Sequence, residues 1–355
     1  MGYWRSLRLM AAFIGVQPVL AAEPAISPPP DGRYVWEALP ERPPGPPGSP
    51  ALIALGRRLF EEPRLSADGS LSCRSCHDLY GKAGADGRAT ARGIGGAVGP
   101  RNTPTVWNTA FQRVLFWDGR APSLEAQAAG PILNPIEMGL PSAAEAERRI
   151  RSAPGYAAAF RAAYGGGAPV SFAGITRAIA AYERTLITSD SPYDRFVRGD
   201  MNALDAPQRR GMALFEAVGC VLCHRGPNFS DASLPDGRHP LRLFPANPGP
   251  AEARHPSLRV DGRAMAWRIP SLRNVALTGP WLHNGAVKRL DEVVRIMAES
   301  QLARSGRLNT WRTSDGTLGR VDRSPLSRQD VADIVAFLHA LSSDSLRRGH
   351  ADGLP

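Results

Sequence analysis

The sequence has no long apolar run beyond its first 22 residues, and it contains only four cysteines among 355 residues. A membrane-spanning helix needs about 20 consecutive apolar residues, so we expect no membrane span in the mature chain. The sequence also lacks a basic run with interleaved aromatic residues, and it has no nucleic-acid-binding motif. Nucleic acid is therefore excluded as a partner despite the formal net charge of +10, which is more typical of a solvated arginine-rich surface.

All four cysteines fall in two C-x-x-C-H motifs, Cys73–His77 and Cys220–His224. Two thiols at this spacing can add to the two vinyl groups of one porphyrin, and the adjacent histidine can bind its iron. A zinc site would place its cysteine pairs about 15–20 residues apart, whereas these pairs are 147 residues apart. Two disulfides would leave both histidines unexplained. The sequence therefore predicts two covalent haem c groups.

Within each motif the expected roles are the same. Both cysteines attach the porphyrin and the histidine is the proximal iron ligand, which assigns Cys73, Cys76 and His77 to one haem and Cys220, Cys223 and His224 to the other.

The first 50 residues have the pattern of an export signal followed by a linker. Residues 1–22 contain Arg5 and Arg8, a short apolar run and Ala21-Ala22, which predicts a cleaved signal peptide and a periplasmic protein. An uncleaved anchor is the alternative, but Pro18 interrupts the apolar run. Residues 23–50 are rich in proline and are expected to form an extended linker.

An internal repeat covers most of the remaining chain. Two groups of residues recur after 155 positions: Gly56, Leu59 and Phe60 as Gly211, Leu214 and Phe215, and Ile179, Tyr182 and Leu186 as Ile334, Phe337 and Leu341. Residues 175–188 and 328–342 also have apolar residues at helical spacing. We therefore predict a mostly α protein with two tandem cytochrome-c-like domains, each with one covalent haem, at 51–195 and 196–345, followed by a tail at 346–355.

Several longer motifs surround the haem-attachment segments. They occupy residues 99–108, 116–120, 124–127, 130–138, 269–274 and 278–285. In combination they resemble the bacterial di-haem cytochrome c peroxidase family, which also contains MauG-type enzymes. The resemblance extends from about residue 51 to 342 and implies an oxidoreductase that reacts with hydrogen peroxide.

The resemblance implies roles around the first haem. His77 would be the proximal ligand of the peroxide-reacting haem, and Glu137 the distal acid–base residue, with Gln127 and Pro131 as the other distal residues. Without the surrounding motif, Glu137 would be interpreted as a surface charge. Trp117 matches a tryptophan between the two haems, where an indole can relay electrons, although a core tryptophan is the ordinary alternative.

The resemblance also implies ligands for the second haem. His224 would be proximal and Met297 distal, as in the peroxidases, whereas MauG has a tyrosine at that position. Methionine ligation raises the haem potential, which suits an electron-accepting relay. The alternatives are that Met265 is the ligand or that Met297 only fills the core.

A calcium ion is implied between the domains, with Asn102 and the backbone oxygens of Thr278 and Pro280 as its ligands. His283 is expected to be a hydrogen-bonding structural residue near a haem pocket. Residues 238–262 are interpreted as a variable surface loop rather than a docking insertion.

One departure from the family pattern concerns the loop before Gly99. Peroxidases of this family often carry a histidine there that caps the first iron, but no histidine occurs from Asp78 to Cys223, and Ile94 occupies the capping position. We therefore expect the first haem to be open on its distal side. The absence of this histidine resembles MauG, whereas Met297 resembles the peroxidases.

Three functions follow as hypotheses. The first is a peroxidase that takes electrons from a small cytochrome c or a cupredoxin. The second is a MauG-like or MbnH-like enzyme that uses peroxide to oxidise residues, such as tryptophan, of a partner protein. The third is a di-haem electron carrier, which would have no need of Glu137. The resemblance also suggests a homodimer.

Overall fold

The structure is a computed structural model that describes residues 34–45, 48–167, 169–237, 239–247, 249–302, 311–312, 318–319 and 326–352. The predicted signal peptide lies outside these residues. In the described part, the longer helices are α1 (Pro50–Phe60), α3 (Leu124–Leu133), α4 (Ala143–Ser152), α5 (Tyr156–Tyr164), α6 (Phe172–Glu183), α8 (Ala206–Ala217), α10 (Leu290–Leu302), α11 (Arg328–Ala340) and α12 (Asp344–Asp352). Shorter helices are α2 (Cys73–Cys76), α7 (Pro192–Val197) and α9 (Pro250–Ala253). The mostly helical composition agrees with the prediction.

Strands make a small contribution to the described fold. β1 (Leu241–Phe244) pairs antiparallel with β2 (Met265–Arg268), and Arg242 lies opposite Trp267. β3 (Trp311–Arg312) pairs with β4 (Leu318–Gly319) in the same sense. Within the residues described, no helix is both long and apolar enough for a membrane crossing.

Two helix pairs have the same packing, at positions 155 residues apart. Helix α1 crosses α6, and a Cβ built on Gly56 would lie 1.9 Å from the carbonyl oxygen of Ala178. Helix α8 crosses α11, and a Cβ on Gly211 would lie 1.8 Å from the carbonyl oxygen of Asp333. Only glycine permits backbones to approach so closely. The repeated glycine and the helices predicted around 175–188 and 328–342 are therefore confirmed.

Side-chain caps fix where most of these helices begin. A serine or aspartate oxygen accepts a hydrogen bond from a first-turn amide, which satisfies a donor that has no partner inside the helix. The capping residues are Ser49, Ser123, Ser142, Ser171, Asp205 and Ser327.

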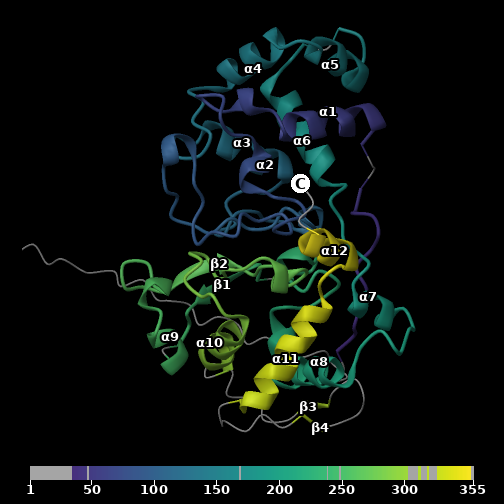
Figure 1. The fold of residues 1–355 in the computed structure, drawn as a ribbon, viewed down its shortest axis with the longest axis vertical. Helices are drawn as coiled ribbons and strands as arrows, with labels where there is room; N and C mark the ends of the chain where they lie inside the picture. The colour runs from purple at the N-terminus through teal and green to yellow at the C-terminus, as the bar shows by residue number, and fades with distance from the viewer. Residues whose placement is uncertain are drawn as a thin grey trace, which may run out of the picture.

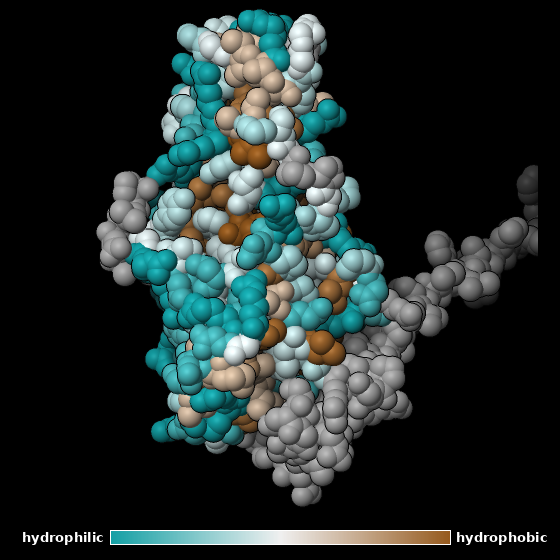
Figure 2. Space-filling model, turned by 90° about the vertical axis from the view of Figure 1, so that its right-hand side faces the viewer, coloured by the Kyte–Doolittle hydropathy of each residue, from teal (hydrophilic) through white to brown (hydrophobic). Residues whose placement is uncertain are grey.

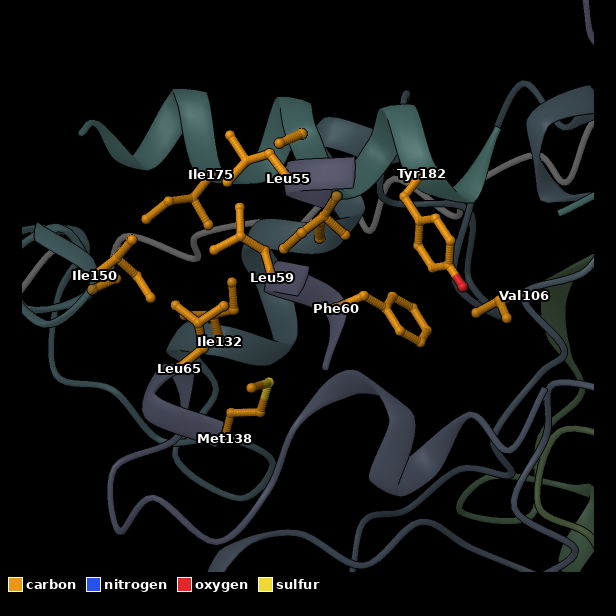
Figure 3. Packing of buried hydrophobic residues seen from close by; sticks show 14 of the residues in the cluster. Leu55, Leu59, Phe60, Leu65, Val106, Ile132, Met138, Ile150, Ile175 and Tyr182 are labelled. Atoms are coloured by element: carbon orange, nitrogen blue, oxygen red, sulfur yellow. The ribbon is translucent and has the colours of Figure 1, made fainter. Parts of the chain in front are cut away.

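The two helix pairs are parts of two large hydrophobic clusters. The first lies around α1, α5 and α6, and Figure 3 shows Leu59, Phe60 and Tyr182 converging within it. The second lies around α8 and α11, where the rings of Phe215 and Phe337 meet edge-on with centroids 5.5 Å apart. In Figure 1 the first group of helices lies above the second.

Two segments outside the repeats are packed into the fold. Residues 34–45 contain no helix or strand, as expected for a proline-rich stretch, but Trp36 packs in the second cluster and Leu39 is fully buried. Residues 346–352 of the predicted tail are part of α12, which lies between the two groups of helices in Figure 1. Its Leu346 is buried in the first cluster, because an apolar side chain on an amphipathic helix gains from that burial.

The β1–β2 hairpin joins the two groups of helices. The backbone amide of Arg268 donates to the carbonyl oxygen of Trp117 at 2.7 Å, and its Nε donates to that of Phe116 at 3.0 Å. Buried residues lie in the two strands and between them: Phe244 of β1, and Ala251 and Leu258 between the strands, pack with Trp267 of β2 in a third cluster. The interpretation of 238–262 as a surface loop is thus wrong for these residues, because their apolar side chains form a core of their own.

Figure 2 shows hydrophobic residues exposed between hydrophilic ones at mid-height on one face.

Candidate functional site

The two C-x-x-C-H segments have matching local structure. Cys73–Cys76 form the single-turn helix α2, and Cys220–Leu222 form a 3-10 turn. In each segment the histidine amide donates to the carbonyl oxygen of the first cysteine at 2.9 Å. One helical turn therefore places both thiols beside the following histidine. None of the four cysteines is in a disulfide.

Both histidines present one ring nitrogen to a backbone carbonyl. Nδ1 of His77 lies 2.9 Å from the carbonyl oxygen of Gly84, and Nδ1 of His224 lies 3.1 Å from that of Phe229. A carbonyl oxygen only accepts, so Nδ1 carries the proton and Nε2 keeps its lone pair. Burial lowers the pKa of His77 and lowers that of His224 to about 4, so both rings are neutral at pH 7. This arrangement fits a proximal iron ligand.

The cysteines are not arranged as a zinc centre in the described residues. Burial raises the pKa of Cys73 and of Cys220 to about 12. Throughout the part of the chain that the structure describes, no group of three or more His, Cys, Asp or Glu side chains could hold a metal ion. The half-buried thiol pairs, each with an adjacent neutral imidazole, fit covalent haem c better than zinc.

Glu137 lies in the turn that follows α3. The chain folds back after Leu133, so that the amide of Met138 donates to the carbonyl oxygen of Pro131 at 3.0 Å. Gln127 and Pro131 are one turn apart and share a face of α3. The structure thus brings Pro131 next to the Glu137 turn, as a shared distal pocket requires.

The Glu137 carboxyl group is half-buried and close to the first thiol pair. Burial raises its pKa, and this effect is opposed by a hydrogen bond from Asn134 Nδ2, 2.7 Å from Oε1, and by the charge of Arg120. The pKa of Cys76 is raised by burial, then by Asp86, and also by the charge of Glu137. The carboxyl group therefore lies within electrostatic reach of α2. A carboxyl group whose pKa is raised towards neutrality is suited to proton transfer.

The loop that contains Ile94 packs against the same turn. The amide of Ile94 donates to the carbonyl oxygen of Glu137 at 2.9 Å. A Cβ on Gly93 would lie 2.0 Å from the carbonyl oxygen of Ile136, so only glycine fits there. The side chain of Ile94 lies against Gly139. The residue at the expected capping position is therefore aliphatic and packed against the turn.

Trp117 lies at the contact between the two groups of helices. Its Nε1 donates to the carbonyl oxygen of Asn102 at 2.8 Å, and its ring meets His283 edge-on with centroids 6.5 Å apart. Trp117 and Met297 both pack against the third cluster, Met297 from helix α10. Met265, the alternative ligand, is 42% exposed at the start of β2. The relay role of Trp117 and the ligand role of Met297 stay predictions.

The His283 imidazole lies among aromatic rings, and its Nε2 is buried with no hydrogen-bond partner among the described residues. The imidazole ring is stacked on Trp267, with centroids 4.3 Å apart. The guanidinium of Arg101 lies over the Trp267 ring, 4.7 Å from its centroid. Burial and the nearby charge of Arg101 lower the pKa of His283 to about 4.

The three residues predicted to bind calcium lie on segments that meet. The amide of Asn102 donates to the carbonyl oxygen of His283 at 2.9 Å, in the segment that also holds Thr278 and Pro280. The side chain of Asn102 donates through Nδ2 to the carbonyl oxygen of Arg88 at 2.8 Å. The three residues are neutral and supply no carboxylate, so the calcium ion stays a prediction.

Sequence reasoning did not assign a role to Asn134, Gly93 or Trp267. Asn134 has a visible signal, because asparagine before proline often ends a helix. The close approach at Gly93 and the stack on Trp267 depend on contacts between distant segments, which the sequence does not display.

Comparison with known proteins gives a consistent result. Residues 50–202 match the family model described as di-haem cytochrome c peroxidase. The chain is 40% identical to cytochrome c551 peroxidase of Pseudomonas aeruginosa, over 85% of this chain and 82% of that protein. It is 41% identical to cytochrome c peroxidase Ccp of Escherichia coli over 82% of this chain, but spans only 58% of that longer protein.

MauG proteins are also similar. The chain is 36% identical to methylamine utilization protein MauG of Methylorubrum extorquens, over 84% of this chain and 80% of that one. Among solved structures, a MauG-like protein associated with microbial copper homeostasis matches with a TM-score of 0.68 and 32% identity, over 88% of this chain and 95% of that chain.

Proposed function

The chain belongs to the di-haem cytochrome c peroxidase family, and we propose that it is an exported enzyme that reduces hydrogen peroxide at its N-terminal haem and draws electrons through its C-terminal haem. Its relatives are named cytochrome c peroxidases and MauG, so the chain is a di-haem oxidoreductase and haem c is its implied cofactor. The observation that carries the proposal is the half-buried Glu137, held by Asn134 and close to the first thiol pair.

Each haem would be held by one C-x-x-C-H segment. Cys73 and Cys76 would attach the first haem, and His77 would bind its iron through Nε2, which the bond from Nδ1 to Gly84 leaves free. Cys220, Cys223 and His224 would hold the second in the same way, and Met297 would complete it. The two haem-binding units would be domains at 51–195 and 196–345, preceded by a linker at 23–50.

The residues around the first haem would manage the protons of the reaction. When bound, the haem iron supplies a site for one peroxide oxygen and a source of electrons for O–O cleavage. Glu137 would take a proton from one peroxide oxygen and deliver it to the other, which leaves as water. Pro131 and Gln127 would line the space beside it. In total, one hydrogen peroxide, two electrons and two protons give two waters.

Hydrogen peroxide would reach the first iron without prior reduction of either haem. The loop at 93–97 is hydrogen-bonded to the Glu137 turn, and Ile94 at the capping position has no nitrogen or sulfur ligand to offer. We therefore expect the oxidised protein to react with peroxide directly. Trp117, at the contact between the helix groups, would pass electrons from the second haem to the first.

The source of the electrons distinguishes two enzymes. A small cytochrome c or cupredoxin would make the chain a peroxidase. A protein substrate whose residues are oxidised would make it MauG-like, and two observations favour this second candidate: the missing capping histidine and the similarity to a MauG-like protein associated with copper homeostasis. A pure electron carrier is disfavoured because it needs no distal carboxyl group.

Location, calcium and assembly are further parts of the proposal. Export to the periplasm rests on the signal-peptide pattern of residues 1–22 and on the extracytoplasmic attachment that haem c requires. Asn102, Thr278 and Pro280 would bind one calcium ion between the domains. A homodimer rests on the family resemblance alone.

The direct test is to mix hydrogen peroxide with the fully oxidised di-haem protein and to follow the haem absorption from the first moments of mixing. Immediate loss of the ferric high-spin bands supports an open first haem. A reaction that begins only after one haem has been reduced would contradict it, and would mean that another residue caps the iron. Adding a reduced small cytochrome c or cupredoxin afterwards tests for peroxidase turnover.

A further inference from the structure

Asn134 occupies the point where α3 ends and the Glu137 turn begins. Its amide donates to the carbonyl oxygens of Gly130 at 3.0 Å and Pro131 at 3.3 Å, which closes the helix. Its carbonyl oxygen accepts from the amides of Glu137 at 3.0 Å and Gly139 at 2.9 Å, which closes the turn. The backbone of Asn134 thus ties the helix to the loop that carries the carboxyl group.

The side chain of Asn134 makes two further bonds whose directions are fixed. The backbone amide of Ile136 lies 3.2 Å from Oδ1 of Asn134, and a backbone amide only donates. The oxygen of the side-chain amide must therefore face Ile136, because a flipped amide would place its NH2 group against the N–H of Ile136, and both groups are donors. Nδ2 is then directed at Oε1 of Glu137, 2.7 Å away.

The Glu137 turn is also held from outside by a backbone bond. Ile94 donates to its carbonyl oxygen, while Gly93 packs against the peptide of Ile136. These contacts place the main chain of Glu137 but do not reach its carboxyl group. In the described residues, the direct hydrogen bond to this carboxyl group comes from Asn134.

From this geometry we propose that Asn134 is a positioning residue for proton transfer: its amide holds Oε1 of Glu137 and leaves Oε2 as the oxygen that exchanges protons with peroxide. The inference rests on the proposed role of Glu137 as the acid–base residue. A donor favours the ionised carboxylate and opposes the effect of burial. Asn134 would therefore keep Glu137 able to accept a proton in the resting enzyme.

Few other charges face this carboxyl group. Arg120, whose charge lowers the pKa of Glu137, lies on the loop after Phe116 and is paired with Asp118 at 2.8 Å. Cys76 on α2 is affected by Glu137, Asp86 and Arg88, but as a thioether in the haem-bound protein it does not titrate. On the 93–97 loop, the contacting residues Gly93 and Ile94 are uncharged, as are Gln127 and Pro131 on α3. A pH effect that depends on Asn134 would thus report on Glu137.

The sharpest variant is Asn134→Asp in the di-haem protein. Aspartate keeps an oxygen that accepts from Ile136 but removes the donor and places a second carboxyl group beside Glu137. The lost bond and the new repulsion should shift the acid limb of the peroxide reaction upward by about one to two pH units. Asn134→Ser, which adds no charge, should shift it in the same direction by less. Asn202→Asp is the matched control, since Asn202 is exposed and remote in sequence from the turn.

Two measurements make the test decisive. The first is the rate of the peroxide reaction from pH 4 to 9 by rapid mixing. The second is an infrared pH titration of the protonated carboxyl band that disappears in Glu137→Gln, which needs no turnover. The inference predicts parallel shifts in both measurements for Asn134→Asp and no further shift when Asn134→Asp is added to Glu137→Gln.

The outcomes distinguish a failure of this inference from a failure of the proposed function. If Glu137→Gln abolishes the acid limb but both Asn134 variants keep the wild-type titration, the inference is wrong and the proposed function stands. If Glu137→Gln itself leaves the rate and its pH profile unchanged, the proposed function fails. Should Asn134→Asp lose its haem or melt early, Asn134→Ser supplies the same comparison.

Discussion

The two halves of the molecule share a glycine-mediated helix crossing and a C-x-x-C-H segment, but they differ in the elements beside that segment. In the first half, α3 leads into the turn with Asn134 and Glu137, which places a carboxyl group within electrostatic reach of the thiol pair. In the second, the β1–β2 hairpin and α10 occupy the corresponding part of the chain, and Met297 packs among apolar side chains. We infer that the elements that differ between the halves, and not the repeated helices, would decide the chemistry of each haem.

The similarity of the proximal sides sharpens this contrast. Both histidines direct Nδ1 at a carbonyl oxygen, at 2.9 and 3.1 Å, and burial lowers both pKa values. A difference in reactivity between the two haems therefore has to arise on the distal side or from buried charge nearby. Four predictions test this comparison.

The largest effect is expected from Glu137→Gln, which removes the carboxyl group beside the first thiol pair. Acid–base groups contribute about 10²–10⁴-fold to rate, so the peroxide reaction of the oxidised protein should slow by about a hundredfold or more. Rapid-mixing absorption spectroscopy measures it, with Glu41→Gln, an exposed carboxyl group, as control. A rate within twofold of wild type would remove the claimed difference between the halves.

A buried carboxyl group on α6 is the next difference between the halves. Glu183 is 4% exposed, while its counterpart 155 positions later is the buried Leu338. Burial raises the pKa of Glu183 to about 8, opposed by Arg184 and assisted by Glu125. Between about pH 4.5 and 8, the folded protein keeps a proton that the unfolded chain releases, so stability falls as pH rises.

Glu183→Gln should remove this loss of stability, which amounts to about 1.4 kcal/mol for each unit of pKa shift. Denaturant unfolding of both proteins at a series of pH values measures it. Parallel pH dependence in the two proteins would show that Glu183 is ionised in the fold.

The shared framework can be broken in either half by one methyl group. Gly56→Ala and Gly211→Ala each force a Cβ to within 2 Å of a carbonyl oxygen, and should destabilise the protein by about 1–3 kcal/mol. Gly166→Ala, where a Cβ meets nothing within 4 Å, is the control. Thermal unfolding should show similar losses of stability for the variants at the two helix crossings. A loss at one crossing only would mean that the two helix pairs are not equivalent.

The smallest effect concerns the second haem. Replacing a methionine ligand by histidine lowers a haem potential, so Met297→His should shift the second midpoint potential downward by on the order of 0.1 V. The control Met265→His should leave it unchanged, because Met265 is exposed on β2. Spectroelectrochemical titration separates the two. A shift in Met265→His alone would reassign the ligand.

The sequence predicts the parts of the fold that depend on local pattern. The haem segments are visible as motifs, and Gly56 and Gly211 reveal the repeated helix crossing because no other residue fits it. Burial of Leu346 in the first cluster and of Trp36 in the second was not predicted, since a single apolar residue in a short segment gives no periodic signal.

The site was predicted unevenly for the same reason. Glu137 belongs to a motif, but the bond from Asn134 depends on how α3 ends, and the Gly93 contact joins segments more than 40 residues apart. The stack of His283 on Trp267 joins the hairpin to a later loop. Such contacts follow from tertiary packing, which no window of the sequence contains.

The central claim is that the first haem is open and the second is closed in the resting, fully oxidised protein. Low-temperature electron paramagnetic resonance tests it directly, because iron with one axial protein ligand is high-spin and iron with two is low-spin. The account predicts equal amounts of one high-spin and one low-spin ferric haem in the wild-type protein. Of the variants, Met297→Ala alone should lose the low-spin signal. Two low-spin haems in the wild-type protein would contradict it.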